Sequence, residues 1–337
     1  MKSFDVHPID YINEVIEINL DPDSGSPYWN REIRKLGLDY REIKIEDLRD
    51  LKKFGYREES EIGNTYALDL KPKSIPNSEV FIGYSSGTTA NPLRNKGGKK
   101  KIPWSKEFLD ATTEYVAKEL ESWKVPKNKT WHAMGPPGIF ERHLTDVAHK
   151  LDGIMFYTAV EPIYMKMLPK NMSSEEEHAI KNYKNVLGKI IDFQTRDIMN
   201  NYEPEVVMNL PPILKMWKES EDIKTDQVEA TLFGGMGVSD EEVKVLKEYF
   251  PIFTGWYGNI VFGTAMWKIG NETPVYDTPK PLLYIDIVDP NDLKSVEINR
   301  KGIVLAHRFD KASFLPNIIT KDIGIKRENG FKVIGRL

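Results

Sequence analysis

The stretch VFIGYSSGTTANP, residues 80–92, joins a strand-like apolar run to a loop of small hydroxyl-bearing residues. Its apolar half, Val80–Tyr84, predicts a buried strand. The loop offers four hydroxyl groups, and its glycine lets the backbone approach an anion closely. In wound α/β sheets, ligands bind where loops leave the carboxyl ends of strands. The loop is therefore a candidate phosphate-binding site, with a polar surface turn as the alternative. The candidate residues are Ser85, Ser86, Gly87, Thr88 and Thr89.

On the C-terminal side of this loop, strand-like apolar runs alternate with helical patterns. The next helix is predicted from about Pro103 to Trp123. Two later helices open with capping boxes, which pair Ser174 with Glu177 and Ser239 with Glu242. Alternation of this kind predicts a mostly parallel sheet with helices on both faces.

The two ends of the chain have a different texture. Residues 1–75 form short amphipathic helical segments, which predict an N-terminal helical part. From about Pro281 the apolar residues alternate with a period of two, and Asn329-Gly330 is a hairpin-turn pair, so antiparallel β structure is predicted there. We therefore predict three parts: a helical segment at 1–75, an α/β core at 76–280 and an antiparallel β subdomain at 281–337.

Composition excludes several classes of function. The chain has 337 residues, of which 40% are hydrophobic and 29% charged, so it is globular and long enough for about two packed units. A formal net charge of -4 gives no general attraction to nucleic acid or anionic lipid. The absence of cysteine excludes disulfides, thiolate zinc sites and a cysteine nucleophile on this chain. No apolar run approaches the ~20 residues of a membrane span, so a cytoplasmic protein is expected.

The loop SSGTTANP resembles the phosphate-binding loop of the adenylate-forming enzymes, the superfamily of acyl-CoA synthetases and luciferases. Further segments resemble motifs of this superfamily in the same order: FGGMGVSDEE at 233–242, GWYGN at 255–259, ITKDIG at 319–324 and the final GRL. The segment at 26–51 is similar to N-terminal helices of the phenylacetate-CoA ligase branch, which includes coenzyme F390 synthetases. The resemblance covers effectively the whole chain.

This resemblance implies that the chain binds ATP and AMP, activates a carboxylic acid as an acyl-adenylate, and passes the acyl group to CoA or another thiol. The implied adenine- and ribose-binding residues are Gly234, Gly235, Met236, Tyr257, Gly258, Asp322 and Arg336. The implied pocket for an aryl or medium apolar acid contains His132, Met134 and Trp256. The residues alone leave other roles open. The two aromatics Trp256 and Tyr257 could be core residues, Asp322 a turn residue and His132 a structural histidine.

The chain departs from the superfamily's pattern at four positions that manage the charge of ATP. Val261 stands where an acidic residue helps to hold Mg²⁺, so Mg²⁺ is expected while its ligand is in doubt. The other three departures are Met236 for a glutamate, Ile319 for an arginine and Asn91 for a basic residue. Neutralising phosphate charge is the largest electrostatic task in adenylyl transfer. The basic run Arg94–Lys101 would supply cations to the phosphates of ATP or CoA, or it is a solvated surface loop.

The chain reaches Leu337 where the superfamily's mobile C-terminal domain would begin, so the usual catalytic lysine is not in this sequence. A separate chain carrying that domain and an acyl-acceptor protein are therefore candidate partners, and a homodimer is a further expectation. Two functions are predicted as alternatives. One is an AMP-forming acid-thiol ligase, and the other is a non-catalytic subunit that binds a nucleotide or acyl-adenylate and works with a partner chain.

Overall fold

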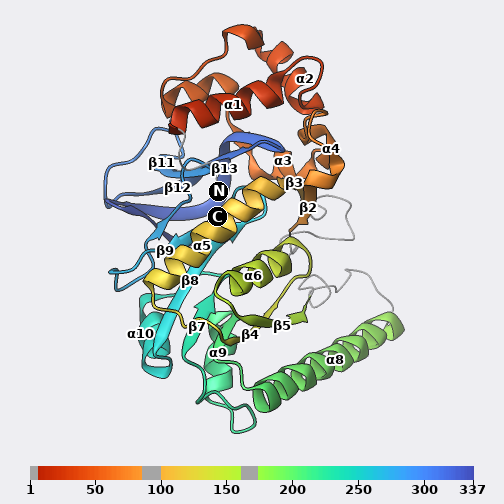
Figure 1. Cartoon of the computed structure of the whole chain (residues 1–337), viewed down its shortest axis with the longest axis vertical. Coiled ribbons are helices and arrows are strands. Elements are labelled where there is room, and N and C mark those ends of the chain that lie inside the picture. The colour runs from red at the N-terminus through yellow and green to blue at the C-terminus, as the bar shows by residue number, and fades with distance from the viewer. Residues whose placement is uncertain (1–6, 86–99, 161–173) are drawn as a thin grey trace. The chain divides into compact units, whose positions relative to one another are not determined.

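The computed structural model describes residues 7–85, 100–160 and 174–337 (Figure 1). The chain divides into two compact units. The first comprises residues 1–84, 100–115 and 257–337, and the second comprises residues 85–99 and 116–256. The first unit therefore gathers segments from both ends of the chain, whereas most of the second is one continuous stretch.

The second unit contains a parallel sheet. Its strands follow the order β8, β7, β6, β4, β5, and each neighbouring pair is parallel. This arrangement confirms the parallel sheet predicted from the alternation of strands and helices. The strands are β4 (Thr130–Gly135), β5 (Ile154–Ala159), β6 (Val206–Asn209), β7 (Ala230–Phe233) and β8 (Ile252–Asn259), which continues into the first unit. The helices are α5 (Lys106–Ser122), which begins in the first unit, α6 (Ile139–Lys150), α8 (Ser174–Asp197), η4 (Ile198–Tyr202), α9 (Pro211–Lys218) and α10 (Asp240–Tyr249).

Local sequence explains how these helices begin and which side they bury. At α10 the Glu242 backbone N–H donates to Ser239 Oγ at 3.2 Å, and the Ser239 N–H donates to the Glu242 carboxylate at 2.8 Å. These two bonds confirm the predicted capping box. The predicted box of Ser174 and Glu177 lies outside the described side chains. Helix α6 buries residues at helical spacing, which are Leu144, Val147 and Ala148.

The first unit is built on an antiparallel sheet. Its strands follow the order β11, β12, β13, β14, β10, β9, and β1 adds to β13 in parallel. This pattern confirms the antiparallel structure predicted for the C-terminal region. The strands are β1 (Arg57–Glu58), β9 (Gly263–Trp267), β10 (Tyr276–Asp277), β11 (Leu283–Val288), β12 (Lys301–Asp310), β13 (Ser313–Arg327) and β14 (Gly330–Arg336).

The hairpin between β13 and β14 turns one residue earlier than the sequence predicts. Gly330 already pairs with Arg327, so the two turn residues are Glu328 and Asn329. Gly330 has a φ of +143°, and a Cβ there would lie 2.1 Å from the Tyr276 carbonyl oxygen. The glycine is therefore required by close packing of the strand rather than by the turn itself.

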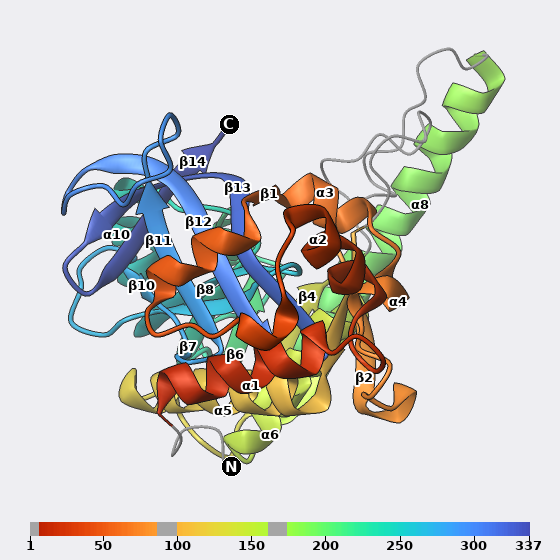
Figure 2. The same ribbon diagram turned by 90° about the horizontal axis from the view of Figure 1, so that it is seen from above.

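The N-terminal helices pack against the C-terminal strands of the same unit, and Figure 2 shows α1 next to β13. The Tyr11 hydroxyl donates to the Phe309 carbonyl at 3.2 Å, and the Trp29 indole N–H donates to the Phe314 carbonyl at 2.7 Å. These contacts place the two ends of the chain in one unit, so the compact units divide the chain at other positions than the predicted 75/76 and 280/281 boundaries. The helices are α1 (Pro8–Leu20), α2 (Pro27–Leu36), η1 (Tyr40–Glu42), η2 (Leu48–Phe54), α3 (Glu59–Asn64), α4 (Ala67–Leu70) and η3 (Asn77–Glu79).

The strand that leads into the hydroxyl-rich loop, β2 (Val80–Tyr84), does not occupy a buried place in the parallel sheet. It pairs in antiparallel fashion with β3 (Lys101–Ser105) in a two-stranded sheet, and within β2 only Gly83 is buried. The prediction of a buried strand is therefore wrong, because a short apolar run satisfies the strand pattern without fixing its partner. The helix predicted from Pro103 begins later, at Lys106, because Pro103 pairs within β3.

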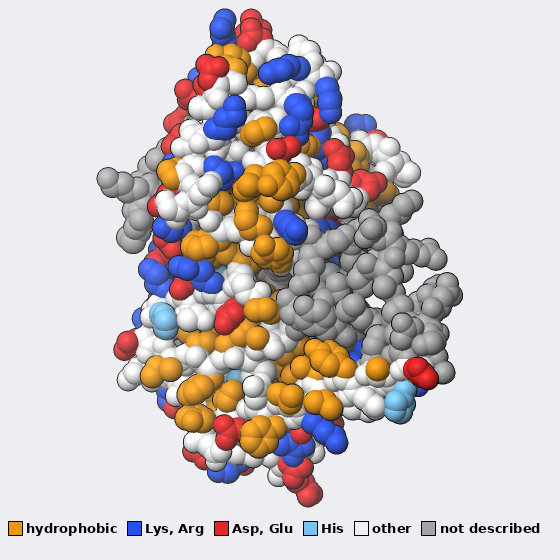
Figure 3. Space-filling view, turned by 90° about the vertical axis from the view of Figure 1, so that its right-hand side faces the viewer, with side chains coloured by type: hydrophobic (Ala, Val, Ile, Leu, Met, Phe, Trp, Pro, Cys, Tyr) orange, Lys and Arg blue, Asp and Glu red, His pale blue; other side chains and the backbone are white. Residues whose placement is uncertain are grey.

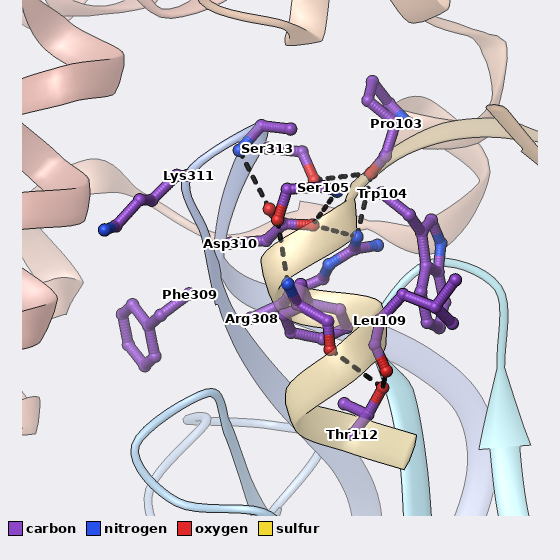
Figure 4. Close-up of polar contacts among 12 residues, drawn as sticks. Pro103, Trp104, Ser105, Leu109, Thr112, Arg308, Phe309, Asp310, Lys311 and Ser313 are labelled. Carbon is purple, nitrogen blue, oxygen red and sulfur yellow. Dashed lines mark hydrogen bonds and ion pairs between the residues drawn. The ribbon is translucent and has the colours of Figure 1, made fainter. Parts of the chain in front are cut away.

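The core of the first unit contains a buried ion pair (Figure 4). Arg308 Nη2 lies 2.5 Å from Asp310 Oδ2, and neither side chain is exposed to solvent. Asp310 also accepts the backbone N–H groups of Ser105 at 3.1 Å and Ala312 at 2.8 Å. Both oxygens of the carboxylate are therefore satisfied inside the protein, as a buried charge requires.

The guanidinium of Arg308 also fills a slot between aromatic rings and carbonyl groups. Its carbon lies 4.5 Å from the ring centroid of Trp104 and 4.4 Å from that of Phe108. It donates to the carbonyls of Pro103 at 2.8 Å and Val261 at 3.1 Å. Arg308 lies on β12 and thus contacts β3, α5 and the segment that follows β8. Its removal would affect all of these segments.

Charged side chains of both signs lie on the surface, and Figure 3 shows them mixed over one face. This mixture agrees with the small net charge of -4. Among the residues that the structure describes, no helix is both long and apolar enough to cross a bilayer.

Candidate functional site

Two residues predicted to bind nucleotide, Tyr257 of β8 and Asp322 of β13, meet in the first unit. The Tyr257 hydroxyl donates to Asp322 Oδ2 at 2.6 Å, although the two residues are 65 positions apart. The Asp322 backbone N–H donates to Thr320 Oγ1 at 3.1 Å, and only 8% of Asp322 is exposed. The Tyr257 ring contacts Tyr276 and Phe331, with centroids 5.9 and 5.6 Å away. A backbone hydrogen bond therefore fixes Asp322, and ring contacts fix Tyr257.

A second carboxylate lies beside this pair. Glu59, the first residue of α3, accepts the side-chain amide of Asn259 at 2.6 Å and forms an ion pair with Lys100. Its other oxygen lies 3.5 Å from Arg336 Nη2, and Arg336 Nε lies 3.7 Å from Asp322 Oδ1. Arg336 thus bridges the two carboxylates. We call this group the carboxylate cluster, and its members are Glu59, Lys100, Tyr257, Asn259, Asp322 and Arg336.

The charges of the carboxylate cluster balance, with two carboxylates against two cations. Burial raises the pKa of Asp322, against the opposing effects of the Tyr257 hydrogen bond and the Arg336 charge. Burial and the Asp322 charge also raise the pKa of Tyr257 well above its usual value, so the phenol stays a neutral donor. An ionised carboxylate has about four acceptor positions. Asp322 therefore retains acceptor capacity that suits the hydroxyl groups of a sugar.

Replacing Glu59 with glutamine should disturb this balance. We expect the Glu59→Gln variant to lose about 1–3 kcal/mol of unfolding free energy, because two partly buried cations lose their anionic partner. Urea unfolding of the full chain measures this change. The matched control is Glu58→Gln, since Glu58 is the exposed neighbour. Equal losses in the two variants would contradict a special role for Glu59.

The other predicted nucleotide-binding residues are not members of the carboxylate cluster. Ser86, Gly87, Thr88 and Thr89 lie outside the described residues, and Ser85 is the last described residue before them. Gly258 follows Tyr257 in the first unit and is exposed. Nucleotide contacts at the hydroxyl-rich loop remain a prediction.

Gly234, Gly235 and Met236 follow β7 in the second unit. A Cβ at Gly234 would lie 2.4 Å from Trp256 Nε1, so the absence of a side chain lets the indole edge pack on the backbone. Gly235 has a φ of +79°, which favours glycine, and Met236 is exposed. The three residues form a tight turn with an exposed apolar side chain.

The three residues predicted for an acid pocket all lie in the second unit. His132 is fully buried, its Nε2 lies 3.1 Å from Thr158 Oγ1, and its ring stacks on Trp217 at a centroid distance of 5.6 Å. Met134 is half-buried two residues along the same strand. In this arrangement the His132 ring contacts core residues, and its role toward an acid stays a prediction.

Trp256 belongs to the second unit, and its side chain is buried. It meets Phe140 edge to face at 5.8 Å between centroids and stacks on His143 at 5.6 Å. Its ring therefore links β8 to α6 and to the glycine turn after β7. His143 serves this packing, and within the described ranges no three His, Asp or Glu side chains gather as a metal site would need.

The two buried histidines make stability depend on pH. Burial lowers the pKa of His132 and of His307 from 6.5 to about 4. The unfolded chain therefore takes up protons first as the pH falls from about 6.5 to about 4, and stability is lost over that window. We expect about 3 kcal/mol per histidine at most. Urea unfolding at several pH values should show a shallower acid loss for His132→Gln than for the exposed control His149→Gln. Equal slopes would contradict this expectation.

Val261 occupies the position where the resemblance implies an acidic magnesium ligand. It is fully buried, and its backbone N–H donates to Asn259 Oδ1 at 2.9 Å. Both carboxylates of the carboxylate cluster already face side-chain cations. The described donor set therefore does not fit a magnesium ion, and lysine and arginine supply the positive charge of the cluster.

Sequence reasoning assigned no role to Glu59 or Asn259. Glu59 belongs to the acidic run REESE at 57–61, and nothing in that run distinguishes it from solvated neighbours. Its burial follows from the pairing of Glu58 with Ile319, which fixes the start of α3 against β13. Lys100 lies in the basic run that was predicted to supply cations, and here it pairs with Glu59.

The chain is similar in fold to solved CoA ligase structures. A 2-hydroxyisobutyryl-CoA ligase in an open conformation with 2-HIB-AMP and CoA has a TM-score of 0.68 at 10% identity, over 97% of this chain and 74% of that chain. The same ligase in its thioesterification state has a TM-score of 0.69 at 10% identity, over 98% and 67%. MatB from Rhodopseudomonas palustris with bound ATP has a TM-score of 0.47 at 15% identity, over 76% and 47%. No protein-family model and no curated protein matches the sequence. The chain therefore has the α/β fold of the 2-hydroxyisobutyryl-CoA ligase over nearly its whole length.

Proposed function

We propose that this protein is a member of the adenylate-forming superfamily and activates a carboxylic acid with ATP. The observation that carries the proposal is the 2.6 Å hydrogen bond between Tyr257 and Asp322. These residues belong to two separate motifs of the resemblance, and a common nucleotide site requires them to meet. The likeness in fold to a CoA ligase solved with an acyl-AMP compound supports the same reading.

In the proposed reaction, a carboxylate oxygen of the acid attacks the α-phosphorus of ATP, and the bond to pyrophosphate breaks. The products are an acyl-adenylate and pyrophosphate. Ionised Asp322 accepts the ribose hydroxyl groups, and the Tyr257 hydroxyl fixes the orientation of this carboxylate. Arg336 lies beside Asp322 and limits the negative charge near the nucleotide. We assign phosphate binding to Ser85 and the four residues after it.

The acyl group then passes to a thiol of another molecule, since the chain contains no cysteine. We propose CoA or an acceptor protein as the thiol carrier. We propose an aryl or medium apolar acid, which the resemblance to the phenylacetate-CoA ligase branch implies, with a pocket that contains His132, Met134 and Trp256. Gly234, Gly235 and Met236 are proposed to lie along the adenine.

The test is ATP-pyrophosphate exchange with a panel of aryl and short branched acids. We expect exchange that depends on one class of acid and falls strongly in the Asp322→Asn variant. Hydroxamate formation with the same acid identifies the acyl-adenylate. Folded protein that gives neither signal across the panel, with and without Mg²⁺, would contradict acid activation.

A second candidate function is nucleotide binding without catalysis, in partnership with another chain. The observation that favours it is Val261, which is buried in the core where a catalytic carboxylate is implied. Calorimetry with ATP, AMP and CoA separates the two candidates. Binding of AMP without exchange supports the second, and exchange with any acid supports the first.

A further inference from the structure

A cavity of about 840 Å³ opens in the first unit, apart from the carboxylate cluster, which contributes none of its described lining residues. Its size is that of a small-molecule site. One wall is a face of the antiparallel sheet. In the register of β11 and β12, Tyr284 faces His307 and Asp286 faces Leu305. Residues that alternate along paired strands share one face, so these four side chains lie together on the wall.

His307 presents a hydrogen-bond donor to this cavity. More than nine-tenths of the residue is buried, and burial holds its pKa at about 4, so the ring is neutral at pH 7. Its Nδ1 accepts the backbone N–H of Asn317 at 3.1 Å. A neutral imidazole that accepts at one nitrogen carries its proton on the other. Nε2–H is therefore the donor, and it has no hydrogen-bond partner among the described residues that line the cavity.

Helix η2 also lines the cavity, and it is fixed to the sheet wall. The Asn317 side-chain amide donates to the carbonyls of Leu51 at 2.5 Å and Gly55 at 3.0 Å. Asn317 thereby fastens η2, which carries Arg49 and Lys52 at the rim, to the strand that orients His307. The donor and the rim cations are held on one framework, as a preorganised site requires.

The charge of the lining selects the ligand. Seven lining residues are Lys or Arg and three are Asp or Glu. Five of the seven cations form ion pairs: Lys326 with Asp286, Lys268 and Lys280 with Asp277, Lys294 with Asp292, and Arg49 with Asp47. Lys52 has no ion-pair partner within the described part of the chain, so its charge is available to a ligand at the rim. Cationic charge that no carboxylate neutralises attracts an anionic ligand to the rim.

We propose that this cavity binds a small organic anion. The apolar body of the anion lies on the Tyr284 and Leu305 side chains, and its anionic oxygen accepts a hydrogen bond from His307 Nε2–H. Lys52 supplies charge at the entrance. The site is independent of the proposed acid activation, because the two sets of residues are separate. The ligand class is a carboxylate or a phosphate monoester attached to an apolar body. Inorganic phosphate lacks the apolar body, and an uncharged ring lacks the anionic oxygen.

The experiment is isothermal calorimetry of the full chain with phenyl phosphate, benzoate, inorganic phosphate and phenol. We expect phenyl phosphate or benzoate to bind at least about tenfold more tightly than inorganic phosphate and phenol. His307→Asn keeps an acceptor for the Asn317 N–H but removes the Nε2–H donor, so it should weaken binding by about tenfold. Lys52→Gln should weaken it by several fold. The control Lys301→Gln alters an exposed lysine at the start of the His307 strand, outside the lining, and should leave binding unchanged.

Asp322→Asn separates this site from the nucleotide site. Phenyl phosphate binding that survives Asp322→Asn but falls in His307→Asn supports the cavity. Binding lost in Asp322→Asn and kept in His307→Asn assigns the probe to the nucleotide site and overturns the proposal. Absence of binding by both organic anions overturns it as well, and so does inorganic phosphate that binds as tightly as they do. Thermal unfolding of His307→Asn confirms that the variant is folded when binding is measured.

Discussion

The Arg308→Met variant is expected to lose about 3–5 kcal/mol of unfolding free energy. The physical reason is the Asp310 carboxylate, which would remain fully buried without a cation 2.5 Å away. The substitution also removes the arginine N–H groups that donate to the Pro103 and Val261 carbonyls. Urea unfolding followed by tryptophan fluorescence measures the loss, since Trp104 lies against the guanidinium.

Two comparisons make this result specific to the ion pair. Lys294→Met removes an exposed cation paired with Asp292 and should leave the unfolding free energy nearly unchanged. The double variant Arg308→Met with Asp310→Asn should be more stable than the sum of the two single losses predicts, because the buried charge is gone. Additive losses in the double variant would show that the two charges do not depend on each other.

The Asp322→Asn variant is expected to bind AMP about 10- to 100-fold more weakly than the natural chain. Asparagine keeps an oxygen for the Tyr257 hydroxyl but loses the charge that strengthens hydrogen bonds from the ribose. Calorimetry with AMP measures the change. Binding by the natural chain should also weaken as the pH falls through the raised pKa of Asp322, because the protonated acid is a poorer acceptor.

Asp292→Asn is the matched control, since Asp292 is an exposed aspartate of the same unit. It should bind AMP as the natural chain does. The acid-side weakening should disappear in Asp322→Asn, where no carboxyl group remains to titrate. Unchanged AMP affinity in Asp322→Asn would remove the central residue from the proposed nucleotide site.

Sequence periodicity predicted the fold best where one pattern persists over several elements. The alternation from about residue 281 onward predicted the antiparallel strands, and the alternation of strands with helices predicted the parallel sheet of the second unit. The pattern failed at Val80–Tyr84, where five residues read as a buried strand but pair only with β3. A short run carries no information about its partner, and the partner decides whether the strand is buried.

The carboxylate cluster contains residues that the motifs singled out and residues that only the fold supplies. The sequence singled out Tyr257, Asp322 and Arg336, and the structure brings these three together. Glu59 arrives from a segment about 200 residues away from Asn259, through the pairing of β1 with β13. No local pattern encodes such a contact, because it exists only when distant strands are in register.

The discontinuous first unit has a consequence for synthesis of the chain. Tyr11 and Trp29 contact residues 298 and 285 positions later, so their partners are synthesised only after the whole of the second unit. The second unit lies mostly within residues 116–256 and is complete earlier. Because domains fold as units during translation, the nascent N-terminal helices wait with exposed apolar faces while the middle of the protein folds first. A ribosome stall before Phe314 would thus leave a folded centre between two unfolded arms.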